Sequence, residues 1–359
     1  MKKNRLKIIF VILIFFSLSA VLTYPLISYF NRGIPYTRTP AEGWDVRVLE
    51  QGDHLQLYYH FWLARDALRR EKPFFVDPYE FSVPGIKIFT VRRLPLSIIF
   101  VIFSVFGGAF AYNATVIISL TFSGLAMFLL ARIYLKSDFP AFIAGLIYAV
   151  SPFTVAQLLG GHTNGFLWGI VPLAVFSLEK LFSEGKLKFA LLYFFCLFSF
   201  ALIEYHLLYY LSFFSLLFLP IRTVTSLARW KEANFNLIKR LLKAWAPIFL
   251  SLLLVFLFVV FLKNVELGVS IARKGRDLSE VRLYSPGIRD LFSRGNVDAE
   301  KNIYLGMVSL ALAFLGFIFS SCRPANNTNQ YEEKINRLFF AGGLLISTIL
   351  ALGPSLNDF

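Results

Sequence analysis

Apolar runs of membrane-spanning length follow one another along most of the chain, with short polar stretches between them. A helix of about 20 apolar residues crosses a hydrocarbon core of about 30 Å. The pattern therefore predicts an all-α, polytopic transmembrane helical bundle of about nine or ten apolar segments, at about 7–30, 95–111, 113–135, 139–159, 165–183, 188–203, 206–220, 244–263, 302–320 and 337–353. We expect a single membrane domain over 1–359, with a long first outer loop carrying juxtamembrane helices at 31–93 and a second polar loop at 264–301.

Composition agrees with this class and narrows the partners. The chain is 57% hydrophobic and 16% charged, with a mean hydropathy of +0.64, outside the balance of soluble domains. Its net charge of +14 comes from Lys and Arg in the loops between apolar runs, where such residues orient a membrane protein. We therefore expect contact with membrane lipids and no nucleic-acid partner. Cys196 and Cys322 are spaced like neither a disulfide framework nor a metal motif.

The N-terminus carries four basic residues ahead of the first apolar run: Lys2, Lys3, Arg5 and Lys7. They predict a cytoplasmic N-terminus and an uncleaved anchor, since the apolar part is too long for the core of a signal peptide. The expected location is the plasma membrane, with many crossings and the 31–93 loop outside.

Length and charge disagree on the number of crossings between Arg93 and Arg132. Length favours two helices with a turn at Tyr112, because the 41 residues of 95–135 would form a helix about 62 Å long. That count places 14 Lys and Arg outside, against the positive-inside rule, in the stretches Arg132 to Lys136, Lys180 to Lys188, Arg222 to Lys243 and Arg323 to Arg337. An odd number of crossings restores the rule, for example if 95–111, broken by Gly107-Gly108, is a re-entrant or surface helix. This topology brings His54, His60, His162 and His206 to one side of the membrane, together with Asp53 and Glu204.

Asp53 begins an amphipathic stretch in the first outer loop and admits two interpretations. It is the expected N-cap of a helix, with Gln56 completing a capping box, an apolar stripe at Leu57, Phe61, Ala64 and Leu68, and an end at Lys72-Pro73. A helix lying on the membrane surface explains this pattern without catalysis. The functional interpretation makes Asp53 a general base or metal ligand beside His54, held rigidly by the capped helix end.

Two further polar interruptions are candidate sites. His162 and Asn164 lie between glycines, where they are either a flexible polar turn or a contact for phosphate or metal. Glu204 and His206 interrupt an apolar stretch, where they are either a short interfacial turn or functional intramembrane groups. No HExxH or CxxC signature is present, so a divalent cation held by Asp53 and His162 remains a hypothesis.

The second polar loop is rich in arginine. Arg273, Arg276 and Arg289 are candidate clamps for a phosphate, because guanidinium groups bind phosphate oxygens through paired hydrogen bonds. Binding to anionic lipid headgroups is the alternative.

Several of these segments resemble the GT-C superfamily of integral-membrane glycosyltransferases, particularly bacterial mannosyl- and arabinosyltransferase-like proteins. The similarity lies in a long outer loop with an Asp after the first span, in Gly52-Asp53-His54-Leu55-Gln56, and in Ser123-Gly124-Leu125-Ala126, Ala144 to Phe153, Pro172-Leu173 to Glu179-Lys180-Leu181 and Glu300 to Gly306. It covers most of the chain without a short invariant signature. The later spans and outer domain of many members have no counterpart here, so the chain is expected to be a truncated member.

The resemblance implies an enzyme that takes a sugar from a polyprenyl-phosphate donor on the outer leaflet, with Asp53 as catalytic base. His54, His162, Asn164, Glu204, His206 and the three arginines would then contact substrate. Members of the superfamily commonly have a second acidic residue near the position of His162. This chain has none there, which argues against dependence on a divalent cation. Two other functions stay open: a transporter or flippase for a lipid-linked sugar, and a non-catalytic scaffold of the cell envelope.

Overall fold

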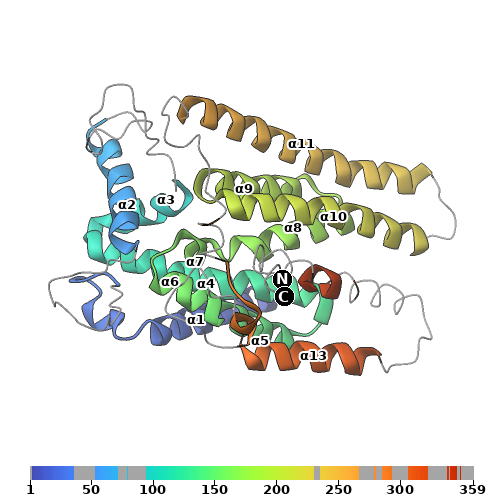
Figure 1. Cartoon of the computed structure of the whole chain (residues 1–359), viewed down its shortest axis with the longest axis horizontal. Coiled ribbons are helices and arrows are strands. Elements are labelled where there is room, and N and C mark those ends of the chain that lie inside the picture. The colour runs from blue at the N-terminus through green and yellow to red at the C-terminus, as the bar shows by residue number, and fades with distance from the viewer. Residues whose placement is uncertain are drawn as a thin grey trace. The chain divides into compact units, whose positions relative to one another are not determined.

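The fold is all-α, as predicted. The computed structural model describes residues 2–35, 53–71, 79, 94–229, 235–266, 279, 285–292, 306–321, 338, 340–345 and 348, which form 12 α-helices and no strand (Figure 1). Four helices within these ranges are long and apolar enough to span a membrane, at Gly108–Leu135, Gly165–Glu184, Tyr205–Val224 and Leu241–Leu262. A fifth span results if two helices bent by 42°, Asp138–Ala149 and Pro152–Leu158, cross together. These helices indicate a membrane protein.

Contacts divide the chain into two compact units. Unit 1 comprises Met1–Val150, Thr154–Ser212 and Pro247–Lys274, and unit 2 comprises Ser151–Phe153, Phe213–Ala246 and Gly275–Phe359. The expectation of one membrane domain over 1–359 stays a prediction.

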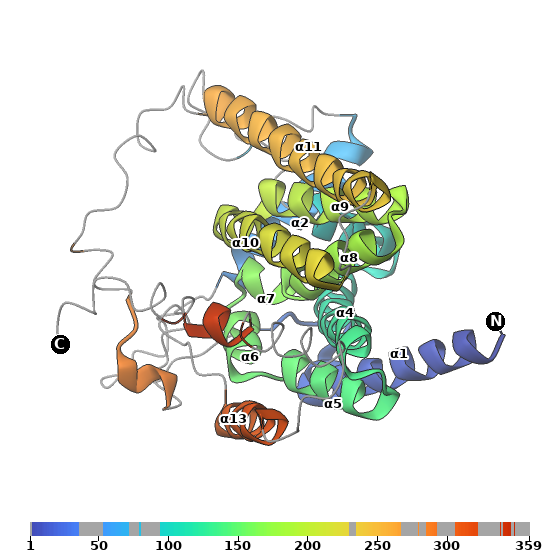
Figure 2. The same cartoon turned by 90° about the vertical axis from the view of Figure 1, so that its right-hand side faces the viewer.

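Helix α4 (Gly108–Leu135) is the centre of unit 1. It packs against α1 (Lys2–Leu22), α3 (Leu94–Phe103), α5 (Asp138–Ala149), α7 (Thr163–Leu167) and α8 (Ile170–Glu184), as Figure 2 also shows for α5. At 28 residues α4 is about 42 Å long, enough to cross a bilayer with both ends projecting.

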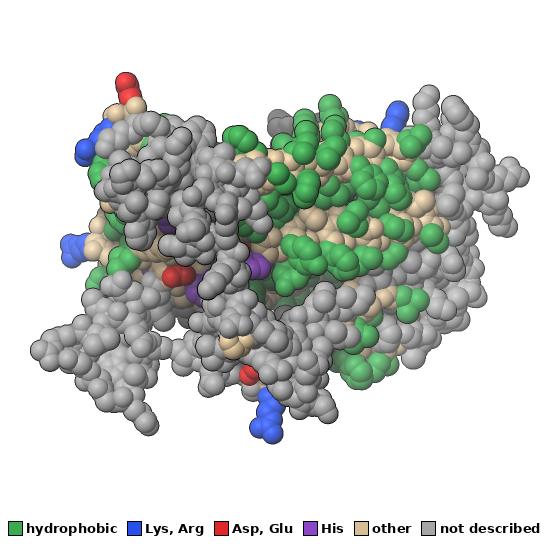
Figure 3. Space-filling view, turned by 45° about the horizontal axis from the view of Figure 1, so that its top comes forward, with side chains coloured by type: hydrophobic (Ala, Val, Ile, Leu, Met, Phe, Trp, Pro, Cys, Tyr) green, Lys and Arg blue, Asp and Glu red, His purple; other side chains and the backbone are tan. Residues whose placement is uncertain are grey.

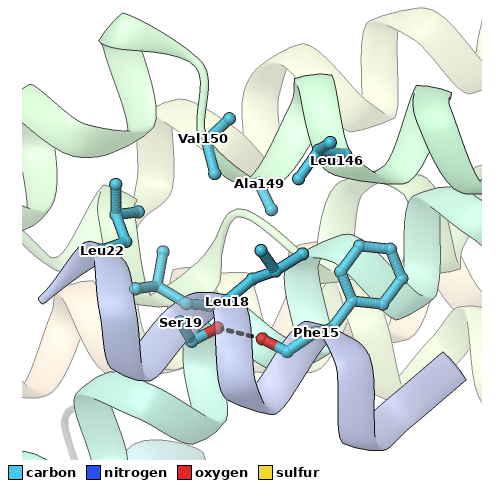
Figure 4. Close-up of a pocket in the computed structure, with 8 residues that line it drawn as sticks. Phe15, Leu18, Ser19, Leu22, Leu146, Ala149 and Val150 are labelled. Carbon is cyan, nitrogen blue, oxygen red and sulfur yellow. Dashed lines mark hydrogen bonds between the residues drawn. The ribbon is translucent and has the colours of Figure 1, made fainter. Parts of the chain in front are cut away.

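Small residues let α1, α4 and α5 approach closely. A methyl group added at Gly145 of α5 would lie 2.6 Å from the carbonyl oxygen of Gly124 of α4, and Phe15 of α1 is fully buried beside both glycines. A small apolar pocket remains between α1 and α5 (Figure 4), lined by Phe15, Leu18, Ser19, Leu22, Leu120, Leu146, Ala149 and Val150. The Ser19 hydroxyl donates to the Phe15 carbonyl at 2.7 Å, so the polar group at this pocket is satisfied within its own helix.

The region 95–135 contains one helix of spanning length, in agreement with the odd number of crossings derived from charge. Helix α3 has 10 residues, about 15 Å of helix, and continues into the short 3-10 helix η2 (Ser104–Phe106). The chain then turns at Gly107, whose φ of 113° is a conformation that glycine adopts readily. The turn expected at Tyr112 is wrong, because Tyr112 is fully buried inside α4.

The remaining helices of unit 1 run between the two ends of α4. Lys7 of α1 and Arg132 of α4 both pair with Asp138 at the start of α5, so these three helix ends meet. From there α5 and α6 (Pro152–Leu159) lead back towards the first turns of α4. Helix α8 ends in a charged turn, where Lys180 and Lys186 pair with Glu184, and α9 (Leu187–Ile203) returns from it.

Unit 2 contains the last part of α10 (Tyr205–Arg229) and the first part of α11 (Phe235–Glu266). The Trp245 indole of α11 donates to the Thr223 hydroxyl of α10 at 3.0 Å, which joins the two helices. The short helix η4 (Ile288–Leu291) and α13 (Met307–Ser321) follow.

Candidate functional site

Helix α2 (His54–Arg69) begins directly after Asp53, as the sequence predicts. The backbone of Asp53 is fixed on both sides: its N–H donates to the Gly160 carbonyl at 2.8 Å, and its carbonyl accepts from Leu57 N–H at 2.7 Å. The capping box with Gln56 is wrong, since the Asp53 carboxylate makes no capping hydrogen bond. This side chain is 56% exposed and free to meet another group.

The apolar stripe of α2 is largely confirmed. Leu57, Phe61 and Ala64 are buried, whereas Leu68 is 51% exposed. The helix ends at Arg69, earlier than the expected end at Lys72-Pro73, which lies outside the described residues. Rings of α2 also pack on other helices, because Phe61 contacts Phe100 of α3 at 5.6 Å and Phe166 of α7 at 6.4 Å between ring centroids. Helix α2 is thus anchored in unit 1 by its rings.

Gly161 permits the close approach of the loop after α6 to the start of α2. Its φ is 72°, and an added methyl group would lie 2.8 Å from His54 Cγ and 2.9 Å from the carbonyl carbon of Asp53. The stretch is a turn, as one interpretation expected, and Gly161 packs closely against the backbone at Asp53.

His162 lies across a small gap from Asp53. Its Nδ1 is 2.9 Å from Oε1 of Gln157, and its Nε2 is 3.7 Å from Oδ2 of Asp53. An amide oxygen only accepts hydrogen bonds, so Nδ1 is the donor in this pair. Nε2 and the Asp53 carboxylate lie close enough to each other for one hydroxyl group to contact both.

His54 supports this arrangement from the interior. Its side chain is 2% exposed, and its Nδ1 is 2.7 Å from the hydroxyl of Tyr112, which is fully buried in α4. The expected substrate contact of His54 is not favoured, because the buried ring has no surface to offer. We assign His54 a positioning role that fixes the first residue of α2 to α4.

Gln157 and Tyr112 are the residues that the sequence analysis missed. Gln157 is a buried polar side chain of α6, five residues before His162. Its position as a polar interruption of the apolar run 139–159 was the available signal. Tyr112 gave no such signal, because one tyrosine in an apolar helix is ordinary.

Glu204 and His206 form a local pair between α9 and α10. Glu204 is the C-cap of α9, in an extended conformation, and its Oε1 is 2.8 Å from His206 Nδ1. His206 is 83% exposed and Glu204 is 18% exposed. The geometry fits the interfacial turn that was one of the two interpretations. The direction of α9 places this turn at the Asp53 end of unit 1, and Figure 3 shows histidine and acidic side chains near one another on one face.

The other expected contacts are less defined. Asn164 lies in α7, and its side chain is outside the described part of the structure. Arg289 lies in η4 of unit 2, while Arg273 and Arg276 fall outside the described residues. Across the described ranges, no group of three or more His, Cys, Asp or Glu side chains is placed to hold a metal ion. A divalent cation on Asp53 and His162 stays a prediction.

Comparisons with protein-family models, with curated proteins and with solved structures gave no match. The resemblance to GT-C glycosyltransferases stays a prediction from the sequence.

Proposed function

We propose that this chain is an integral-membrane glycosyltransferase that moves a sugar from a polyprenyl-phosphate donor to an acceptor hydroxyl at the outer face of the membrane. The observation that carries the proposal is the carboxylate of Asp53, which leaves its capping position unused and faces His162 Nε2 at 3.7 Å. A carboxylate held by a fixed backbone beside a histidine suits general-base catalysis.

In the proposed reaction the acceptor hydroxyl donates its proton to Asp53. The acceptor oxygen forms a bond to the anomeric carbon, and the bond between that carbon and the phosphate oxygen breaks, with its electron pair leaving on the phosphate. The exposed carboxylate then releases the proton to water. His162, held by Gln157, orients the hydroxyl beside Asp53. Phosphate binding by Arg273, Arg276 and Arg289 stays a prediction from the sequence.

The transporter hypothesis expects Glu204 and His206 inside a bundle along a membrane path. The 83% exposure of the His206 side chain speaks against an enclosed path at this point. The pair also closes a local turn, whereas Asp53 and His162 come from segments more than 100 residues apart. A long-range juxtaposition of acid and histidine favours the transferase.

Substitution of Asp53 tests the proposal. The full chain in lipid nanodiscs is supplied with radiolabelled polyprenyl-phosphate mannose or arabinose and bacterial membrane lipids as acceptors. We expect Asp53→Asn to lower transfer by about 10²–10⁴-fold, because it removes the base while keeping the side-chain shape. Asp53→Glu, which keeps the carboxylate, should retain more activity than Asp53→Asn.

Thermal unfolding in detergent serves as the control and should give the same midpoint for both variants as for the wild type. Wild-type transfer by Asp53→Asn would refute the catalytic role. A wild-type chain that transfers neither sugar would favour the scaffold hypothesis.

The outer location of the site has its own test. His162→Cys is introduced with Cys196→Ala and Cys322→Ser, and intact cells are treated with a membrane-impermeant maleimide. We expect labelling at position 162 from outside the cell and at Ser183→Cys, in the last turn of α8, only after the cytoplasmic side is opened. The reverse pattern would refute the proposed orientation.

A further inference from the structure

A second polar cluster lies on α2, beyond the gap at Asp53. Tyr59, Trp62, Asp66 and Arg70 recur at helical spacing on one face of the helix. The rings of Tyr59 and Trp62 stack with 27° between their planes, and the ring of Tyr79 lies 5.4 Å from that of Trp62. We call Tyr59, Trp62 and Tyr79 the aromatic shelf.

Asp66 holds the shelf in place. Its carboxylate is 8% exposed and accepts from the Tyr79 hydroxyl at 2.6 Å and from Arg70 Nε at 2.8 Å. A buried carboxylate with both oxygens engaged fixes its partners well, because breaking either contact would leave a buried charge less satisfied. Arg70 remains 62% exposed and Tyr79 43% exposed, so the far side of the guanidinium and one ring edge reach solvent.

The shelf differs from the other aromatic cluster of α2. Phe61 is fully buried against rings of neighbouring helices and serves packing. Tyr59 and Trp62 are half-buried, with an ion pair beside them. Partly exposed rings next to an oriented guanidinium present both an apolar plane and hydrogen-bond donors.

We propose that the aromatic shelf binds a pyranose ring of the glycan acceptor. Such a ring has an apolar face of C–H groups, which stacks on an indole or phenol ring, and a rim of hydroxyls, which accept from Arg70 and exchange hydrogen bonds with the tyrosine hydroxyls. The proposal rests on the proposed transferase function. Along the axis of α2, Tyr59 and Trp62 lie about 9 and 14 Å from Asp53. The shelf thus holds a sugar unit behind the one that reacts.

A lipid anchor is the rival for these rings, since Trp, Tyr and Arg also gather at membrane interfaces. An inserted helix keeps its lipid face apolar, whereas this face carries the pair of Asp66 and Arg70. Leu55, 45% exposed near the start of α2, is the side chain that an anchor would use and the shelf would not.

Binding of α-mannotriose to the full chain in nanodiscs, measured by saturation-transfer NMR, tests the shelf. We expect Trp62→Ala to weaken binding by about 2–10-fold, Trp62→Phe to retain most of it, and Leu55→Ser to leave it unchanged. Sorbitol, which has hydroxyls but no ring face, should give no signal. The proposal would be overturned if Trp62→Ala bound mannotriose as tightly as the wild type does, or if sorbitol gave a signal equal to that of mannotriose.

The lipid anchor is measured in nanodiscs that contain brominated lipids. Subtracting the fluorescence of Trp62→Phe from that of the wild type gives the emission of Trp62 alone. Strong quenching of this signal by the lipids, with no protection by mannotriose, would also overturn the shelf. A wild-type chain that binds mannotriose but transfers neither sugar would refute the proposed transferase and support the shelf. A wild-type chain that transfers sugar but does not bind mannotriose would overturn the shelf alone.

Discussion

The two ends of unit 1 use an aspartate of similar exposure in opposite ways. Asp138, 42% exposed, has one oxygen 3.0 Å from Lys7 Nζ and the other 2.8 Å from Arg132 Nε. Asp53, 56% exposed, has a histidine at 3.7 Å and no capping bond. At one end the carboxylate joins three helix ends. At the other end the backbone does the joining, and the carboxylate is left for chemistry.

The two ends of unit 1 are held by different kinds of contact. The end at Asp138 is held by exposed ion pairs, which contribute little and are screened by salt. The end at Asp53 is held by close backbone contact at Gly161 and by the buried bond between His54 and Tyr112. Such contacts tolerate little displacement, as a catalytic group requires.

Replacing a glycine by alanine should lower stability by very different amounts at the two ends. Gly161→Ala forces a side chain into the backbone of α2 at a φ of 72° and should destabilise the protein by about 2–5 kcal/mol. Gly185, after α8, has a φ of 62° with no atom within 4 Å of an added methyl group, so Gly185→Ala should cost only about 1–2 kcal/mol. Thermal unfolding in detergent measures both, and equal shifts would contradict the packed contact.

Removal of one buried hydroxyl should have an intermediate effect. Tyr112→Phe deletes the partner of His54 Nδ1 and should destabilise by about 1–3 kcal/mol, because a buried polar atom loses a hydrogen bond. It should also slow transfer, since the start of α2 is less well fixed. An unchanged unfolding midpoint would show that this bond does not hold α2.

The ion pairs at the other end should matter least. Asp138→Ala removes exposed pairs with Lys7 and Arg132 and should change stability by less than about 1 kcal/mol. Unfolding midpoints at low and high salt check this, and the difference from wild type should shrink as salt rises. A loss of stability above about 1 kcal/mol that persists at high salt would contradict the difference between the two ends.

The helical class was predictable from sequence, because the length of the apolar runs follows from the thickness of the membrane. The position of Asp53 before α2 was also predictable from local pattern. The absence of a capping hydrogen bond from its carboxylate was not predictable, because the contacts of Asp53 with Gly160 and His162 come from residues far along the chain. Gln157 escaped for the same reason: only the folded loop brings its amide to His162.

The transfer rates of Asp53→Asn and Asp138→Asn, measured side by side in the same nanodiscs with the donor that the wild type uses, test the account most directly. Both variants replace one exposed aspartate by its amide. We predict a loss of about 10²–10⁴-fold for Asp53→Asn and the wild-type rate for Asp138→Asn. Equal rates for the two variants would contradict the assignment of Asp53 as the base.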